Sequence, residues 1–81
     1  MKRQQPSWKR AAGGYRRGDI VTVRKRLPWG DAHTPRPWTV CRVVAVDMKP
    51  GNPHPLLCRA VDDPSLEDWF AAQHVEPGDM P

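Results

Sequence analysis

Apolar residues in this chain of 81 residues occur in short runs, and breaks rich in Pro, Gly and Asp separate these runs. Short β-branched runs bounded by turn residues are typical of strands rather than helices. We therefore predict an all-β fold with one short helical turn. The predicted strands cover residues 19–26, 39–47, 56–61, 66–70 and 75–76, and the helical turn covers residues 71–74.

The pattern within these runs predicts which side chains enter the core. Val21 and Val23 alternate with Ile20, Thr22 and Arg24, and we expect the valine face of the first strand to be the inner one. Alternation fails at Val43 and Val44, which predicts a β-bulge or a sharp bend there. A meander closed by the last strand against the first would hide one sheet edge, with Phe70 in the core.

The longest break, residues 27–38, contains three prolines, one glycine and two tryptophans. Proline is excluded from central strands, so this segment is predicted to be a structured loop, and loops of this length are often functional. Residues 48–55 and 62–65 are predicted turns. Asp62 and Asp63 are better explained by Asx hydrogen bonds in such a turn than by paired catalytic carboxylates.

The length allows one small domain, and no apolar stretch is long enough to span a membrane as a helix. The basic N-terminus has no apolar signal region, so we expect a cytoplasmic location. Cys41 and Cys58 lie in apolar runs and should be thiols on neighbouring strands. No CxxC or HxxxH spacing occurs, and we predict neither a metal site nor a cofactor.

Charge divides the chain more sharply than its net value of +4 indicates. Residues 1–26 carry nine basic residues and one acid, a net charge of +8, whereas residues 27–81 carry four basic residues and eight acids, a net charge of −4. Residues 1–17 lack strand or helix periodicity, so we expect a basic arm that is disordered when free. Such an arm is typical of proteins that bind nucleic acid or an acidic surface, although it can also serve only solubility.

The segments GDIVTV, VCRVVAV, LLCRAVDD and EDWFAAQHVEP resemble an SH3-like barrel. The resemblance implies a five-stranded, partly open barrel over residues 18–78, after the arm at 1–17 and before a frayed tail at 79–81. In peptide-binding SH3 domains the closing segment supplies a proline and a tyrosine, and Ala71 and His74 stand in that frame here. Recognition of proline-rich peptides is therefore not expected.

Two enzyme-related barrels are also similar. A plasmid-borne dihydrofolate reductase shares the GD-V start, and its pore-lining run corresponds to residues 67–70 here, which begin with two acids. The nitrile hydratase β chain resembles residues 19–23 and the His33-Thr34-Pro35 run. No nucleophile–base constellation is visible in the sequence, so we expect a non-enzymatic protein, with a dihydrofolate-reductase-like barrel as a remote alternative.

The predicted function is nucleic-acid binding through the arm and the first long loop. Small SH3-like barrels of the KOW and ribosomal-protein type are similar in carrying a basic arm and a functional loop after the first strand. The alternative is a protein-interaction adaptor or regulator anchored by Trp38, Trp69 and His74. The sequence leaves the oligomeric state open. The nucleic-acid-binding candidates are Lys2, Arg3, Lys9, Arg10, Arg16, Arg17, Arg24, Lys25, Arg26, Trp29 and Trp38.

Overall fold

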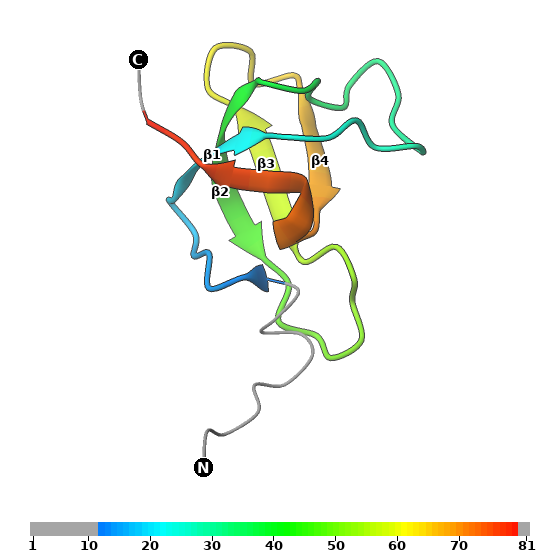
Figure 1. The fold of residues 1–81 in the computed structure, drawn as a ribbon, viewed down its shortest axis with the longest axis vertical. Helices are drawn as coiled ribbons and strands as arrows, with labels where there is room; N and C mark the ends of the chain where they lie inside the picture. The colour runs from blue at the N-terminus through cyan, green and yellow to red at the C-terminus, as the bar shows by residue number, and fades with distance from the viewer. Residues whose placement is uncertain (1–11, 80–81) are drawn as a thin grey trace.

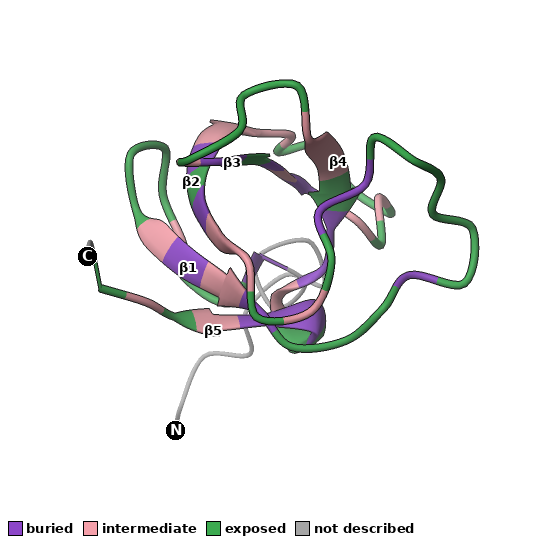
Figure 2. Ribbon diagram, turned by 90° about the horizontal axis from the view of Figure 1, so that it is seen from above, coloured by how far each residue is buried: buried purple, intermediate pink, exposed green. Residues whose placement is uncertain are grey.

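The computed structural model describes residues 12–79. They form one antiparallel sheet of five strands in the order β4-β3-β2-β1-β5, which curls into a half-barrel (Figures 1 and 2). This architecture confirms the predicted all-β class and is compatible with a small SH3-like barrel. The elements are β1 (Ile20–Val23), β2 (Val40–Val46), β3 (Leu56–Ala60), β4 (Glu67–Phe70), the 3-10 turn η1 (Ala72–His74) and β5 (Val75–Pro77).

The interior of the half-barrel is built from the inward-facing residues of every strand. Val21 and Val23 are fully buried, as the alternation in β1 predicts, and Phe70 and Val75 join the same cluster. Strand β1 pairs with β2 on one side and with β5 on the other. The last strand therefore closes onto the first, which confirms the predicted order and covers one edge of β1.

The predicted irregularity in the second strand is a β-bulge. Val43 lies opposite Cys58, but the next paired position is Ala45 opposite Leu57, so Val44 is the extra residue. A bulge bends its strand and increases the local twist. Here it helps β2 to follow the curvature of the half-barrel, so the break in alternation reflects the closure of the fold.

The C-terminal end of the basic arm packs against the barrel, which corrects the expectation of disorder for residues 12–17. Ala12 is 5% exposed and belongs to the core cluster, and Tyr15 packs against that cluster from its edge. Gly13 has a φ of +60°, and a Cβ atom there would lie 2.6 Å from the Cβ of Ala72 in η1. Burial raises the pKa of Tyr15, and nearby Glu76 and Asp19 add to the shift. The rest of the arm lies outside the described residues.

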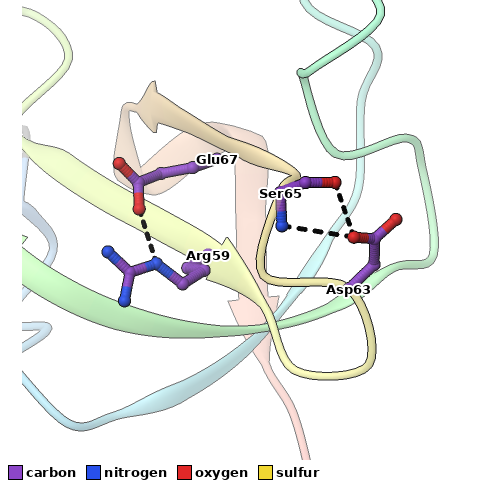
Figure 3. A network of polar contacts seen from close by, with 4 residues as sticks. All are labelled: Arg59, Asp63, Ser65 and Glu67. Carbon is purple, nitrogen blue, oxygen red and sulfur yellow. Dashed lines mark hydrogen bonds and ion pairs between the residues drawn. The ribbon is translucent and has the colours of Figure 1, made fainter.

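The acidic β3–β4 connection is a structural turn, as predicted. The carboxylate of Asp63 accepts hydrogen bonds from the backbone N–H and the hydroxyl of Ser65, at 3.2 and 2.6 Å (Figure 3). Across the adjacent strands, the Nε–H of Arg59 donates to Glu67 at 2.6 Å. These contacts use the carboxylates of Asp63 and Glu67 to hold the β3–β4 hairpin.

The two thiols are fully buried on β2 and β3 and are free. Burial raises the pKa of Cys41 to about 11, and burial together with neighbouring Cys41 raises that of Cys58 to about 12. Both groups are therefore protonated at neutral pH, when they act as small apolar core residues.

Two kinds of feature are absent from the described part of the chain. Residues 12–79 bring together no group of three or more His, Cys, Asp or Glu side chains that could hold a metal ion. Over the same residues, no helix has the length and apolar character needed to cross a membrane.

Candidate nucleic-acid interface

The connection between β1 and β2, residues 24–39, is called the β1–β2 loop here. It leaves the barrel as a wide excursion (Figure 1), yet two of its points are anchored in the protein. Leu27 is 2% exposed and belongs to the core cluster, and Pro35 is also fully buried. The segment between these points therefore has a fixed base, and exposed side chains on it can be held in defined positions.

Polar contacts fix the outer part of the loop against β4. The buried hydroxyl of Thr34 donates to the carboxylate of Asp68 at 2.6 Å and accepts the backbone N–H of Asp31 at 2.9 Å. The N–H of Glu67 donates to the carbonyl of His33 at 2.8 Å, which covers part of the β4 edge. These bonds make the loop a preorganised surface, and preorganisation reduces the ordering cost of binding.

Trp38 occupies a strained position at the end of the loop. The N–H of Thr39 donates to the carbonyl of Arg36, which closes a β-turn with Pro37 and Trp38 at its centre. Trp38 has a φ of 70°, so the turn belongs to the type II class, in which this position favours Gly or Asn. A bulky residue there costs on the order of 1–3 kcal/mol, and such strain is concentrated at functional sites. The side chain is nonetheless 69% exposed, so burial does not compensate for the strain.

Trp29 is the second exposed tryptophan of the loop, at 53%. Its ring meets His54 edge to face, with the ring centroids 4.5 Å apart, and His54 in turn stacks on His74 with centroids 5.6 Å apart. The β1–β2 loop, the β2–β3 connection and η1 therefore meet in one aromatic cluster. This packing orients Trp29 while half of its surface remains open to a ligand.

Four basic side chains accompany the two tryptophans on the loop. All four are exposed, and Asp31 is the single acid between β1 and β2, so the loop has a net charge of +3. One of the four, Arg24, lies 4.0 Å from the carboxylate of Glu76 on β5, at the outer limit of an ion pair. The loop therefore combines aromatic and cationic groups, although residues 12–79 as a whole carry equal numbers of acidic and basic residues. The four residues are Arg24, Lys25, Arg26 and Arg36.

The predicted nucleic-acid-binding residues are thus only partly brought together. Arg24, Lys25, Arg26, Trp29 and Trp38 all lie on the β1–β2 loop. Arg16 and Arg17 are exposed but precede β1, whereas the loop follows β1, so they lie toward the other end of that strand. The remaining four predicted residues lie outside the described residues. They are Lys2, Arg3, Lys9 and Arg10.

The three residues predicted to bind a protein partner lie in different environments. Trp38 is on the loop, and Trp69 is 39% exposed on the outer face of β4. His74 is only 9% exposed, and its Nδ1 accepts the backbone N–H of Ala71 at 3.1 Å. Burial lowers the pKa of His74, with smaller contributions from His54 and Lys25. His74 therefore acts first as a barrel-closing residue, and it offers little surface to a partner.

A cavity of about 540 Å³ lies within the β1–β2 loop. We call it the loop pocket. Apolar parts of the loop form some of its wall, and polar groups and two arginines form the remainder. A volume of this size falls in the range of small-molecule sites, roughly 300–1,000 Å³. The lining residues are Arg26, Leu27, Gly30, Asp31, Ala32, Thr34, Pro35, Arg36 and Pro37.

Two residues of this surface were not singled out from the sequence. Arg36 stands between two prolines in the predicted loop. A count of all basic residues between the first two predicted strands would have added it to the candidates. His54 joins the cluster through contacts with residues 25 and 20 positions away, and no local periodicity signals such contacts. The position of His54 beside Trp29 depends on how the β1–β2 loop and the β2–β3 connection approach each other in the fold.

Comparisons of the chain with protein-family models, with curated proteins and with solved structures gave no match. The likeness to SH3-like barrels consequently rests on the short sequence segments described above and on the five-stranded antiparallel half-barrel.

Proposed function

We propose that this protein is a non-enzymatic nucleic-acid-binding module whose principal contact surface is the β1–β2 loop. The observation that carries the proposal is the coincidence, on one hydrogen-bonded loop, of two exposed tryptophans and four exposed basic side chains. Basic groups contact phosphates, and exposed aromatic rings stack on bases. The strain at Trp38 supports the same assignment, because an exposed indole at a position that favours glycine gives the fold no evident benefit.

The SH3-like topology is in keeping with this function. Barrels of the KOW and ribosomal-protein type, which the sequence resembles, are small and carry a functional loop after the first strand. The basic arm would add phosphate contacts to those of the loop. Fold likeness alone does not define a function, so the proposal rests on the loop residues.

Salt dependence of binding tests the proposal. A labelled single strand of about a dozen nucleotides, titrated by fluorescence anisotropy between about 50 and 200 mM salt, should bind with a steep negative slope of log affinity against log salt. Lys25→Ala combined with Arg26→Ala should reduce the magnitude of that slope by about 1 to 2, since fewer counterions are released when phosphate contacts are lost.

The matched control is Arg42→Ala combined with Lys49→Ala, which also removes two exposed positive charges but lies outside the loop. This variant should bind nearly as well as the natural chain. Equal losses in the two double variants would show that the loop has no special role. Absence of binding by the full chain at low salt would refute the function itself.

The contribution of the arm to binding is tested with a deletion that leaves the C-terminal end of the arm, which packs against the barrel, in place. Removal of residues 1–11 keeps Ala12 and Tyr15 in the barrel, whereas a deletion through residue 17 would also remove core contacts. We expect the shorter deletion to weaken binding and lower the salt slope without changing thermal stability. If the deletion lowered the free energy of unfolding by as much as it lowered the free energy of binding, the arm would be structural, and its direct role in binding would be contradicted.

A second candidate function, protein interaction, is supported by a different surface. Ala45, Leu57 and Trp69 are paired across β2, β3 and β4 and lie on the outer face of the sheet. We call these three residues the outer strand row. Exposed tryptophans are frequent anchors of protein interfaces, so this row is where a protein partner would dock. Loss of a co-purifying partner on Trp69→Ala, with nucleic-acid binding intact, would favour this function.

A further inference from the structure

The loop pocket has features that general electrostatic attraction to a polyanion does not require. A flat basic surface is sufficient for non-specific contact with phosphates. Here the loop instead lines a partly open pocket of about 540 Å³ that combines two exposed arginines with apolar residues, of which Ala32 and Pro37 keep accessible surface. Such a combination suits a ligand that has one anionic end and one flat, less polar end.

From this we infer that the loop pocket seats one nucleotide unit, with its phosphate held by Arg26 and Arg36 and its nucleoside against Ala32 and Pro37. A guanidinium presents a planar fork of donors that matches the oxygens of a phosphate, and Arg26 and Arg36 both line the pocket. The inference rests on the proposed function for the source of the nucleotide, which is a nucleic-acid strand.

Asp31 determines where the phosphate can lie. Asp31 lines the pocket, and its Oδ1 accepts the N–H of His33 at 2.8 Å and lies 3.5 Å from the hydroxyl oxygen of Thr34, whose proton goes to Asp68; residues 12–79 make no other polar contact to this carboxylate. The negative charge repels a phosphate, so the phosphate lies on the arginine side. The other oxygen, Oδ2, is available to accept a hydrogen bond from an amino group of the base or from a sugar hydroxyl.

The pocket also predicts a preference for single strands. A nucleotide that is paired and stacked in a duplex can place its base in this pocket only if it leaves the base stack. Extrusion from a duplex costs a few kcal/mol, whereas a nucleotide in a single strand is free to enter. The exposed rings of Trp29 and Trp38 favour the same form, because stacking on an aromatic side chain requires an unstacked base.

Binding of a single strand and of the corresponding duplex by two matched variants tests the inference. The probe is a labelled strand of about a dozen nucleotides with mixed sequence, used alone and annealed to its complement. Arg26→Ala with Arg36→Ala removes the pocket charges, and Arg42→Ala with Lys49→Ala removes two exposed charges elsewhere. The natural chain should bind the single strand at least about tenfold more tightly than the duplex. The pocket variant should show a clearly smaller preference, because only the stacking of Trp29 and Trp38 remains, and the control variant should keep the full preference.

Equal binding of single strand and duplex by the natural chain would overturn the inference and leave the proposed function standing. An equal single-strand preference in the pocket and control variants would also overturn it.

A titration with AMP, monitored by NMR, distinguishes a site for a nucleotide within a strand from a site for a free nucleotide. AMP should shift the amide signals of Gly30, Asp31 and Ala32 in the natural chain but not in the pocket variant, and inorganic phosphate alone should shift them less. Such shifts without any oligonucleotide binding would support a free-nucleotide site and refute the nucleic-acid function.

Discussion

Two surfaces of this protein expose tryptophan, and they are built in different ways. On the β1–β2 loop, Trp29 and Trp38 stand among four basic side chains on irregular backbone that is held by hydrogen bonds. On the outer strand row, Trp69 lies beside Leu57 on regular sheet, next to the Arg59–Glu67 ion pair, in which the charges compensate each other. The loop surface attracts anions and offers stacking rings, whereas the outer strand row itself is apolar and contains no charged residue, with Arg42 and Arg59 as its basic neighbours.

The backbone strengthens this contrast. Trp69 follows ordinary strand geometry, since its neighbour Phe70 points into the core and its own side chain points outward. Trp38 is instead placed on the surface by a strained type II turn. Exposure of a single tryptophan on a strand is common and needs no functional explanation. Exposure at a conformational cost is uncommon, and it makes the loop the stronger functional candidate.

The largest expected effect distinguishes the two surfaces directly. Trp38→Ala should lower affinity for a single-stranded oligonucleotide by roughly 5- to 150-fold, the range expected for loss of one stacked base. Trp69→Ala should leave this affinity unchanged, because the outer strand row carries no net charge to bring phosphates near. Fluorescence anisotropy at one fixed salt concentration measures both. An equal loss in the two variants would remove the distinction between the surfaces.

A smaller effect concerns stability. Trp38→Gly should raise the free energy of unfolding by about 1 kcal/mol, because glycine adopts a positive φ without steric cost. Trp38→Ala keeps the Cβ atom and hence most of the strain, so it is the matched control. Urea denaturation of the three proteins provides the comparison. A glycine variant that is less stable than the alanine variant would show that the turn is not strained.

The smallest expected effect involves the cluster beneath Trp29. The pKa of His74 is lowered from 6.5 in the folded protein, so the unfolded chain binds the proton more readily. The free energy of unfolding should therefore fall as the pH is lowered from about 6.5 toward the folded-state pKa, and level off below it. His74→Asn retains an acceptor for the Ala71 N–H and should remove this contribution, whereas exposed His33→Asn should retain it. Thermal melts at a series of pH values measure the slope, and an unchanged slope in the His74→Asn variant would contradict the assignment.

Local patterns in the sequence were sufficient to predict most of the fold. The alternation at Val21 and Val23 indicated the inner face of β1, and its failure at Val43 and Val44 marked the bulge. The turn at Asp63 followed from the ability of a short carboxylate to bond to nearby backbone. Each of these features is determined by residues close together in the chain, and sequence patterns report such features well.

The missed features depend on contacts between distant segments. Ala12 enters the core although it lies in a segment with a strong positive charge, and the following residue, Gly13, lies so close to η1 that a Cβ atom there would be 2.6 Å from the Cβ of Ala72. Thr34 bonds to Asp68, which is 34 positions away, and this bond determines how the loop lies against β4. The turn at Trp38 lacks the glycine that normally signals a type II turn. None of these contacts has a periodic signature, so the detailed shape of the candidate site required the structure.

The most direct test of the role of the β1–β2 loop is an NMR titration of the ¹⁵N-labelled protein with a short single strand, observed at the tryptophan indole N–H signals. Assignment of these signals follows from single Trp→Phe variants. The signals of Trp29 and Trp38 should shift progressively with added strand, while that of Trp69 on the outer strand row stays in place. A shift at Trp69 with no change at Trp29 and Trp38 would contradict a nucleic-acid interface on the loop.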